Sequence, residues 1–192
     1  MFLLRRPSNV FVHAFLERQP SSKFSYAHFG ASREGDCPSA YVSDHNRVQL
    51  GCGASTWTVG KQSIREWQMF DIPRLQLCWP NGPITEGTNL AIAIRHFGFW
   101  SLNASRIVYV MEEERRFGFA YGTLMDHSES GEERFMVEWN VADDSVWYDL
   151  FAFSRPNAAL ARFAHPLARR LQRRFARDSM TAMVDCSRDA SA

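Results

Sequence analysis

The most regular pattern in the chain is an alternation of apolar and polar side chains in the second half of the sequence. A period of two is typical of β-strands with one buried and one exposed face. The links between the alternating runs are short, which favours antiparallel pairs, because parallel strands need a long crossover. We therefore expect an antiparallel meander whose strands cover residues 88–97, 102–112, 117–125, 132–141 and 146–154.

The first half of the chain predicts a mixture of elements. Ser8 can cap a short helix that ends before Pro20, and residues 21–39 have an irregular pattern. Residues 41–50 and 75–79 predict two further strands. Between them, residues 55–69 have helical spacing, and Gly60 is a point at which this stretch can divide into two short helices.

A long amphipathic helix is expected from Pro156 to about Met183, because proline is favoured in the first turn of a helix. Its apolar stripe consists of Leu160, Phe163, Leu167, Leu171 and Phe175. A curved sheet cannot bury its concave face alone, so this helix should cover it.

The predicted fold is α+β, of the helix-grip kind. A curved seven-stranded antiparallel sheet wraps around the C-terminal helix, and two short helices follow the first strand. We expect an N-terminal helical extension over residues 1–39, a helix-grip domain over residues 40–184, and a disordered tail over residues 185–192.

Composition and charge narrow the classes of partner. The formal net charge of +1 gives no field that attracts nucleic acid, so no nucleic-acid partner is expected. The arginines between residues 162 and 177 are interpreted as a solvated helix face, with a protein-interaction surface as the alternative. The four cysteines form no CxxC pair, and the first residues are too short for a signal h-region or membrane span. We expect a cytoplasmic protein without disulfides or cofactors.

Glu133 is the main candidate for chemistry. Alternation places it on the same face as Phe135 and opposite residue 152 or 154 of the next strand, so its carboxylate should point inward. A buried carboxylate needs a partner, and Arg106 is the expected one. The pair is then a structural ion pair, a polar anchor in a ligand cavity, or a general acid/base with a shifted pKa.

A second cluster consists of His127, Glu129, Glu132 and Glu133 around one hairpin. These are metal-ligand types, but no second histidine stands at ligand spacing, so no metal site is predicted. His127 at the sheet rim is instead a candidate acid/base or a guard of a cavity mouth. Gly118 and Gly122 lie inside a predicted strand, where they indicate either close approach of the helix or space for a ligand.

Phe151 and Phe153 should point outward from the sheet, opposite to Leu150 and Ala152. Two exposed phenylalanines predict a cover, because large apolar patches on a surface promote association. The N-terminal helix, through Phe11 and Phe15, is one candidate, and a dimer interface is the other.

Several blocks of sequence together resemble a known family. They are residues 24–27 (FSYA), 30–32 (GAS), 44–47 (DHNR), 67–70 (WQMF), 101–109 (SLNASRIVY), 117–124 (FGFAYGTL), 127–135 (HSESGEERF), 154–156 (SRP) and 173–175 (RRF). The chain resembles the domain of unknown function nineteen-ninety family over about residues 2–183. That family is placed near the START and polyketide-cyclase (SRPBCC, Bet v-like) helix-grip superfamily. The resemblance implies this fold and no established activity; other members of the superfamily bind apolar ligands, and a few are enzymes.

The leading functional hypothesis is therefore binding of a small apolar or amphipathic molecule between the sheet and the C-terminal helix. Its candidate ligand-binding residues are Arg106, Tyr109, Tyr121, Glu133, Tyr148 and Arg155. The alternatives are an enzyme of cyclase or hydratase type that uses Glu133 or His127 as acid/base, and an interaction module that uses the basic helix. Monomer and homodimer are both compatible with the pattern.

Overall fold

The structure is a computed structural model of the whole chain, and it describes residues 1–78, 84–96, 98–157 and 165–189. Its main sheet is antiparallel and has the order β2-β8-β7-β6-β5-β4-β3, so the predicted seven strands are confirmed. The elements are β1 (Phe2–Leu3), α1 (Asn9–Leu16), the short 3-10 helices η1 (Gln19–Ser21) and η2 (Ala31–Glu34), β2 (Val42–Cys52), α2 (Gly53–Arg65), the 3-10 helix η3 (Gln68–Phe70), β3 (Leu75–Cys78), β4 (Asn89–Arg95), β5 (Trp100–Glu112), β6 (Arg116–Thr123), β7 (Glu129–Trp139), β8 (Ser145–Pro156) and α4 (His165–Asp189).

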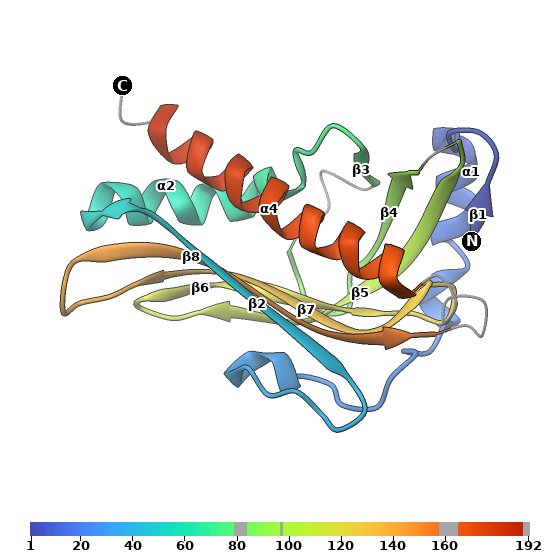
Figure 1. Cartoon of the computed structure of the whole chain (residues 1–192), viewed down its shortest axis with the longest axis horizontal. Helices are drawn as coiled ribbons and strands as arrows, with labels where there is room; N and C mark the ends of the chain where they lie inside the picture. The colour runs from blue at the N-terminus through green and yellow to red at the C-terminus, as the bar shows by residue number, and fades with distance from the viewer. Residues whose placement is uncertain (79–83, 97, 158–164, 190–192) are drawn as a thin grey trace.

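Both longer helices of the domain, α2 and α4, lie over the same concave face of the curved sheet (Figure 1). The predicted grip on the C-terminal helix is thus confirmed. The apolar side chains of β6 and β7 that point inward, Phe119 and Phe135, are fully buried there. Phe70 of η3 packs between two other rings. Its ring centroid lies 5.2 Å from that of Phe135 in β7 and 5.9 Å from that of Phe175 in α4. This central part of the concave face is filled by aromatic rings.

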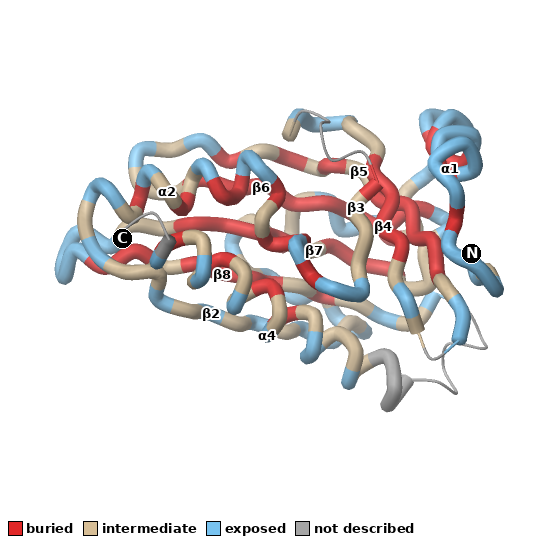
Figure 2. Tube along the Cα trace, turned by 90° about the horizontal axis from the view of Figure 1, so that it is seen from above, coloured by how far each residue is buried: buried red, intermediate tan, exposed pale blue. Residues whose placement is uncertain are grey.

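The N-terminal residues cover the opposite, convex face. Helix α1 packs through Val12 and Phe15 on the small side chains of β4 and β5, such as Ala91 and Ala104. The segment around η2 lies below β7 and β8 (Figure 1). Figure 2 shows the consequence, since the middle strands are buried along most of their length.

Phe151 and Phe153 point to the convex face, as predicted, and both are buried. Their cover is not the N-terminal helix, however. They pack against Tyr26 and Tyr41 from the segment between α1 and β2, and the Tyr41 ring lies 5.3 Å from that of Phe153. The earlier part of the chain, Phe15 included, is used on the other half of the sheet.

The predicted cap of the first helix is confirmed, whereas the predicted break in the second lies at a different residue. The Ser8 hydroxyl accepts a hydrogen bond from the Phe11 backbone N–H at 3.2 Å and caps α1, as expected. Gly60 does not divide the next helical stretch. It lies inside α2, where a Cβ would stand 3.0 Å from Val137, so its small size lets the helix approach the sheet. The break comes at Trp67, whose positive φ of 61° separates α2 from η3.

The C-terminal helix is displaced along the chain relative to the prediction. Pro156 is the last residue of β8 and not the first turn of a helix, because it still pairs with Glu129 of β7. Helix α4 continues to Asp189, so most of the predicted tail is helical. Leu160 and Phe163 of the expected stripe lie outside the described residues, whereas Phe175 packs on the core as predicted.

A β-bulge in β5 changes which side chains point inward. The pairing with β6 shifts between Ile107 and Tyr109, so that Ile107 faces Tyr121 and Tyr109 faces Ala120. A bulge inserts an extra residue and reverses the alternation beyond it. As a result, Arg106 and Tyr109 both lie on the convex face. Without the bulge, simple alternation would place these two residues on opposite faces.

Candidate functional site

Glu133 lies on the concave face, as its alternation with Phe135 predicted. In the sheet it stands between Tyr121 of β6 and Ala152 of β8. The Tyr121 hydroxyl donates a hydrogen bond of 2.5 Å to Glu133 Oε2. Burial raises the pKa of Glu133 to about 7, against the lowering effect of this hydrogen bond. The side chain is nevertheless partly exposed, so an acid that titrates near neutral pH stands on the inner face within reach of solvent.

An ion pair lies two strands away from Glu133, on the other side of β8. Asp44 of β2 is opposite Ala152, on the same face, and it also raises the pKa of Glu133. Arg169 of α4 donates two hydrogen bonds to the Asp44 carboxylate, at 2.5 and 2.7 Å, in the bidentate geometry that favours arginine. Arg169 thus joins the first described turns of α4 to the edge of the sheet.

The contacts of Arg169 continue along the same edge. It also donates to Gln172 Oε1 at 3.0 Å, and the Gln172 amide in turn donates to Ser154 Oγ at 3.0 Å. Glu129 has a raised pKa, first because of burial, and Ser154 and Arg169 lower it. We call these five residues the polar rim: Asp44, Glu129, Ser154, Arg169 and Gln172.

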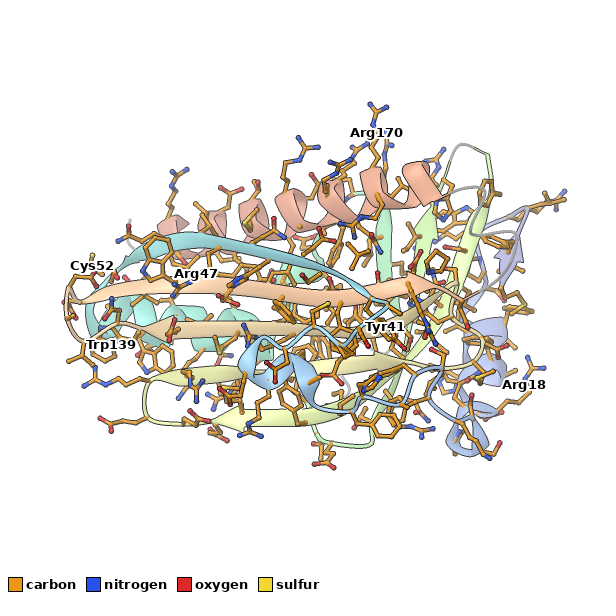
Figure 3. All side chains as sticks on the ribbon, turned by 60° about the horizontal axis from the view of Figure 1, so that its bottom comes forward. Arg18, Tyr41, Arg47, Cys52, Trp139 and Arg170 are labelled. Carbon is orange, nitrogen blue, oxygen red and sulfur yellow. The ribbon has the colours of Figure 1, made fainter. Side chains whose placement is uncertain are left out.

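The polar rim was not predicted from the sequence. Arg169 was assigned to the solvated face of the helix, but its side chain is only 20% exposed and pairs with Asp44. The signal that would have located it is the alternation in β2, since Asp44 shares a face with Val48, which packs on the concave core. The remaining arginines of α4 are different. Arg170 points away from the sheet (Figure 3), and Arg173 and Arg177 are exposed.

Tyr148, another predicted ligand residue, also lies on the concave face. Its hydroxyl is 2.8 Å from Ser179 Oγ of α4, and both side chains are fully buried. Burial raises the pKa of Tyr148 far above its ordinary value. The hydroxyl therefore links the sheet to the helix, about two helical turns from the polar rim.

The predicted pair of Arg106 with Glu133 does not form, because the two side chains lie on opposite faces of the sheet. Arg106 donates to Asn89 Oδ1 and to the Gln19 carbonyl oxygen, both at 2.7 Å. Its guanidinium also lies 5.5 Å from the centre of the Phe24 ring. Arg106 thus holds the N-terminal segment on the convex side and has no contact with the concave site.

Tyr109 and Arg155 are on the convex side as well. The Tyr109 hydroxyl is 2.8 Å from Ser32 Oγ. Arg155 is exposed, and its guanidinium stands 4.7 Å from the centre of the Tyr41 ring, which Figure 3 labels. Arg155 therefore contacts the segment between α1 and β2 at the end of the last strand, and not the concave face. Of the six predicted ligand residues, the structure brings together Tyr121, Glu133 and Tyr148 on one face.

His127 is poorly suited to acid/base work near neutral pH. Its Nδ1 accepts a hydrogen bond from the Glu129 backbone N–H at 3.0 Å, so the ring closes the turn before β7. Burial lowers the pKa of His127 to about 4, which keeps the ring neutral. The predicted cluster around His127 does not stay together. Glu129 is close to His127 in sequence, but Glu132 and Glu133 face opposite sides of β7. In the described part of the chain, no three histidine, cysteine or acidic side chains gather as a metal site would require.

Glu132 anchors the N-terminal segment to the convex face. It accepts hydrogen bonds from the Tyr26 hydroxyl at 2.6 Å and from the backbone N–H groups of Gly30 and Ser32 at 2.9 and 3.1 Å. The Ser32 hydroxyl is a fourth donor. The carboxylate is 2% exposed, and these donors satisfy it without a cation. We call Glu132 and its donors the clasp.

A buried ion pair extends the clasp. Arg134 donates to Asp149 Oδ1 at 2.6 Å and to the carbonyl oxygens of Ser32 and Arg33. Both charged side chains are less than a tenth exposed. His45 and Arg47 reach the other oxygen of Asp149 from the edge strand. The extension is thus fixed to the sheet by hydrogen bonds in addition to apolar packing.

Comparison with known proteins identifies the family. The sequence model of a domain of unknown function, DUF1990, matches residues 25–182. The chain belongs to the DUF1990 family. A DUF1990 relative described as a UPF0548 protein, from Deinococcus radiodurans, is 40% identical over 96% of this chain and 98% of its own length. A UPF0548 protein from Dictyostelium discoideum is 28% identical over 96% of this chain and 94% of its own.

Solved structures show the fold to which this DUF1990 chain is similar. The Zhui aromatase/cyclase from Streptomyces sp. R1128 has a TM-score of 0.56 at 10% identity and covers 79% of this chain and 96% of its own. A hypothetical protein from Helicobacter pylori has a TM-score of 0.51 at 13% identity and covers 87% and 98%. At such low identity the likeness concerns the fold alone, and it confirms the predicted helix-grip architecture.

The motifs that suggested the DUF1990 family are divided between the two faces. The blocks at residues 24–27 and 30–32 supply donors of the clasp, and the block at residues 127–135 supplies both its carboxylate and Glu133. The sequence blocks that resemble the family therefore include residues that hold the N-terminal extension on the sheet, as well as a residue of the candidate ligand site. Across the described helices of the DUF1990 chain, none has the length and apolar character to cross a membrane.

Proposed function

We propose that this protein binds a small apolar or amphipathic molecule at the concave face, between the sheet and α4, with Glu133 and Tyr121 as its polar anchor. The observation that carries the proposal is the Glu133–Tyr121 hydrogen bond on a face that is otherwise lined by aromatic rings. A few convergent polar groups in apolar surroundings are typical of small-molecule sites.

The packing of the core favours one end of this face for the proposed ligand. Phe70, Phe135 and Phe175 fill the centre, so the expected contact is at the end of the face that holds Glu133 and the polar rim. Arg169 of the rim can also receive an anionic head group if it leaves Asp44. A hollow of about 380 Å³ lies elsewhere, beside α1 and η1, and does not belong to this site.

Native mass spectrometry of protein purified from its own host is the first test. A retained small molecule that is lost on Ala152→Trp supports the proposal, because Ala152 stands beside Glu133 on the concave face. Ala142→Trp in the exposed β7–β8 turn is the matched control. Binding of the amphipathic probe anilinonaphthalene sulfonate gives a second reading with the same variants. A ligand retained equally by both variants would place the site elsewhere.

An enzyme of the cyclase or hydratase type is the second candidate, with Glu133 as general acid/base. The favouring observation is its pKa of about 7, which allows both gain and loss of a proton near neutral pH. His127 does not share this property. Host extracts incubated with the protein should then show a compound that gains or loses one water, and Glu133→Gln should abolish the change. Glu138→Gln, on the opposite face of β7, is the control.

The remaining expectations concern partners and location. The exposed arginines of α4 make an interaction surface the third candidate, which salt-dependent pulldowns with Arg170→Glu would test. Cys37, Cys52 and Cys78 are free thiols, which favours the reducing cytoplasm as the compartment. No cofactor is part of the proposal.

A further inference from the structure

The N-terminal end of the molecule exposes an unusual number of apolar side chains. Phe2 is 65% exposed, Leu4 88% and Val10 80%. Phe11 and Phe99 are also exposed, and we call these five residues the N-terminal apolar patch. Single exposed apolar residues are normal, but a group of them at one end of a molecule indicates an interaction surface.

The backbone holds this patch in place. Strand β1 pairs with β5, with Phe2 opposite Ser101 and Leu3 opposite Trp100. Leu3 therefore packs inward on the cluster of Val12 and Phe15, and alternation turns Phe2 outward. Leu4 follows directly after the strand and is exposed. The Phe2 and Phe99 rings meet edge to face, with centroids 5.7 Å apart. Helix α1, which carries Val10 and Phe11, lies beside β1 (Figures 1 and 2).

Three exposed arginines belong to the segments that carry the patch or to the strand beside them. Arg5, Arg6 and Arg95 are exposed, and the first acidic residue of the chain is Glu17. The acidic side chain of Asp126 lies close to the Met1 amino group, whose positive charge it faces. Arg6 is steadied by Gln76, which accepts its Nε–H at 2.9 Å. Exposed apolar side chains among arginines match the interface of an anionic lipid bilayer, where apolar groups enter the head-group region and arginines meet phosphates.

The arginine-rich face of α4 is a weaker candidate for the same partner. It is basic, but among the described residues of α4 no large apolar side chain is exposed. Positive charge alone attracts a protein to an anionic membrane but inserts no side chain into it. The N-terminal end has both positive charge and exposed apolar side chains.

We propose that the N-terminal apolar patch docks this protein on the surface of anionic membranes. Phe2 and Leu4 enter the bilayer interface, and Arg5 and Arg95 contact lipid phosphates. This docking is peripheral and needs no spanning segment. Vesicle binding does not require that the concave site hold a ligand, so the two proposals fail independently.

Vesicle flotation of the full chain tests the docking. Vesicles of phosphatidylcholine with phosphatidylglycerol should carry the protein upward, and vesicles of phosphatidylcholine alone should carry much less. Leu4→Ser should lower the partition coefficient about tenfold, the effect of removing one buried leucine from the interface. Arg5→Glu should lower it by about fivefold or more and weaken its dependence on salt.

Matched controls exist at distant surfaces. Val141 is 69% exposed in the β7–β8 turn, and Arg170 projects from α4 (Figure 3). Val141→Ser and Arg170→Glu should leave vesicle binding unchanged. Leu4 is so exposed that its substitution should not alter the melting temperature, which thermal unfolding checks.

Three results would overturn the docking proposal. One is absence of flotation with either vesicle, and another is loss of binding with Arg170→Glu but not with Leu4→Ser. The third is a concentration-dependent dimer, seen by analytical ultracentrifugation, that Leu4→Ser dissociates while vesicles bind nothing. That last result would assign the patch to a second copy of the chain.

Discussion

Glu132 and Glu133 are consecutive residues of β7 whose carboxylates accept tyrosine hydroxyls on opposite faces of the sheet. Glu132 accepts Tyr26 on the convex face at 2.6 Å, and Glu133 accepts Tyr121 on the concave face at 2.5 Å. Glu132 has four donors and is almost fully buried, whereas Glu133 has Tyr121 and remains partly exposed. One carboxylate fastens the extension, and the other is the polar anchor of the proposed ligand site.

Replacement of Glu133 by glutamine should remove a pH dependence of stability. The pKa of Glu133 is raised from its ordinary 4.5 to about 7 in the folded chain. Its contribution to stability is therefore complete below about pH 4.5 and declines as the pH rises through 7. Glu133→Gln should match the parent at pH 4 and exceed its free energy of unfolding by about 2 kcal/mol at pH 8.

Urea unfolding at a series of pH values measures this difference. Glu112→Gln is the control for removal of one carboxylate, because that side chain is exposed on the surface. If Glu133→Gln and its parent keep parallel profiles from pH 4 to pH 8, Glu133 does not titrate near neutrality, and the acid/base role loses its support.

Replacement of Glu132 by alanine should loosen the N-terminal segment. The Tyr26 hydroxyl and the N–H groups of Gly30 and Ser32 would then lack their acceptor. Unpaired buried donors are expensive, so the free energy of unfolding should fall by roughly 3 kcal/mol. Hydrogen exchange should accelerate at residues 30 and 32. Glu133→Ala should leave those amides protected, and equal acceleration in both variants would contradict the division of roles.

The sequence was sufficient to predict the architecture, because the alternation of β4 to β8 and their short links leave few arrangements. The inward orientation of Glu133 followed from the same rule. Each of these inferences depends on neighbours in sequence or on adjacent strands, where the geometry is nearly fixed.

The contacts of the site residues could not be predicted from the sequence, because they depend on how distant segments are arranged in space. The bulge after Ile107 reverses which side chains of β5 point to the concave face. No local sequence pattern indicates where the extra residue of a bulge is inserted. Arg106 was therefore assigned to the wrong side. Arg169 and Asp44 are 125 residues apart in sequence, so their pairing depends on how α4 crosses the sheet. The cover of Phe151 also depends on the path of an irregular segment.

Gly122 lies at a close approach, but the neighbouring group is neither the C-terminal helix nor a ligand space, the two causes that the sequence suggested; it is Tyr26 on the convex face. A Cβ at this position would lie 2.2 Å from the Tyr26 hydroxyl oxygen, so Gly122→Ala should displace Tyr26 and weaken its bond to Glu132. We expect a loss of about 1–3 kcal/mol in the free energy of unfolding. In a Tyr26→Ala background the same substitution should cost little. Additive losses in this double-mutant cycle would refute the contact.

His127 should titrate far below an ordinary histidine. Burial lowers its pKa from 6.5 to about 4, so the folded chain resists protonation that the unfolded chain accepts. The stability that His127 contributes is therefore complete above about pH 6.5 and is lost as the pH falls through 4. NMR titration of the ring protons of His127 should give a midpoint near 4. A midpoint near 6.5 for His127 would show that its ring is solvated, and would restore it as a candidate acid/base beside Glu129.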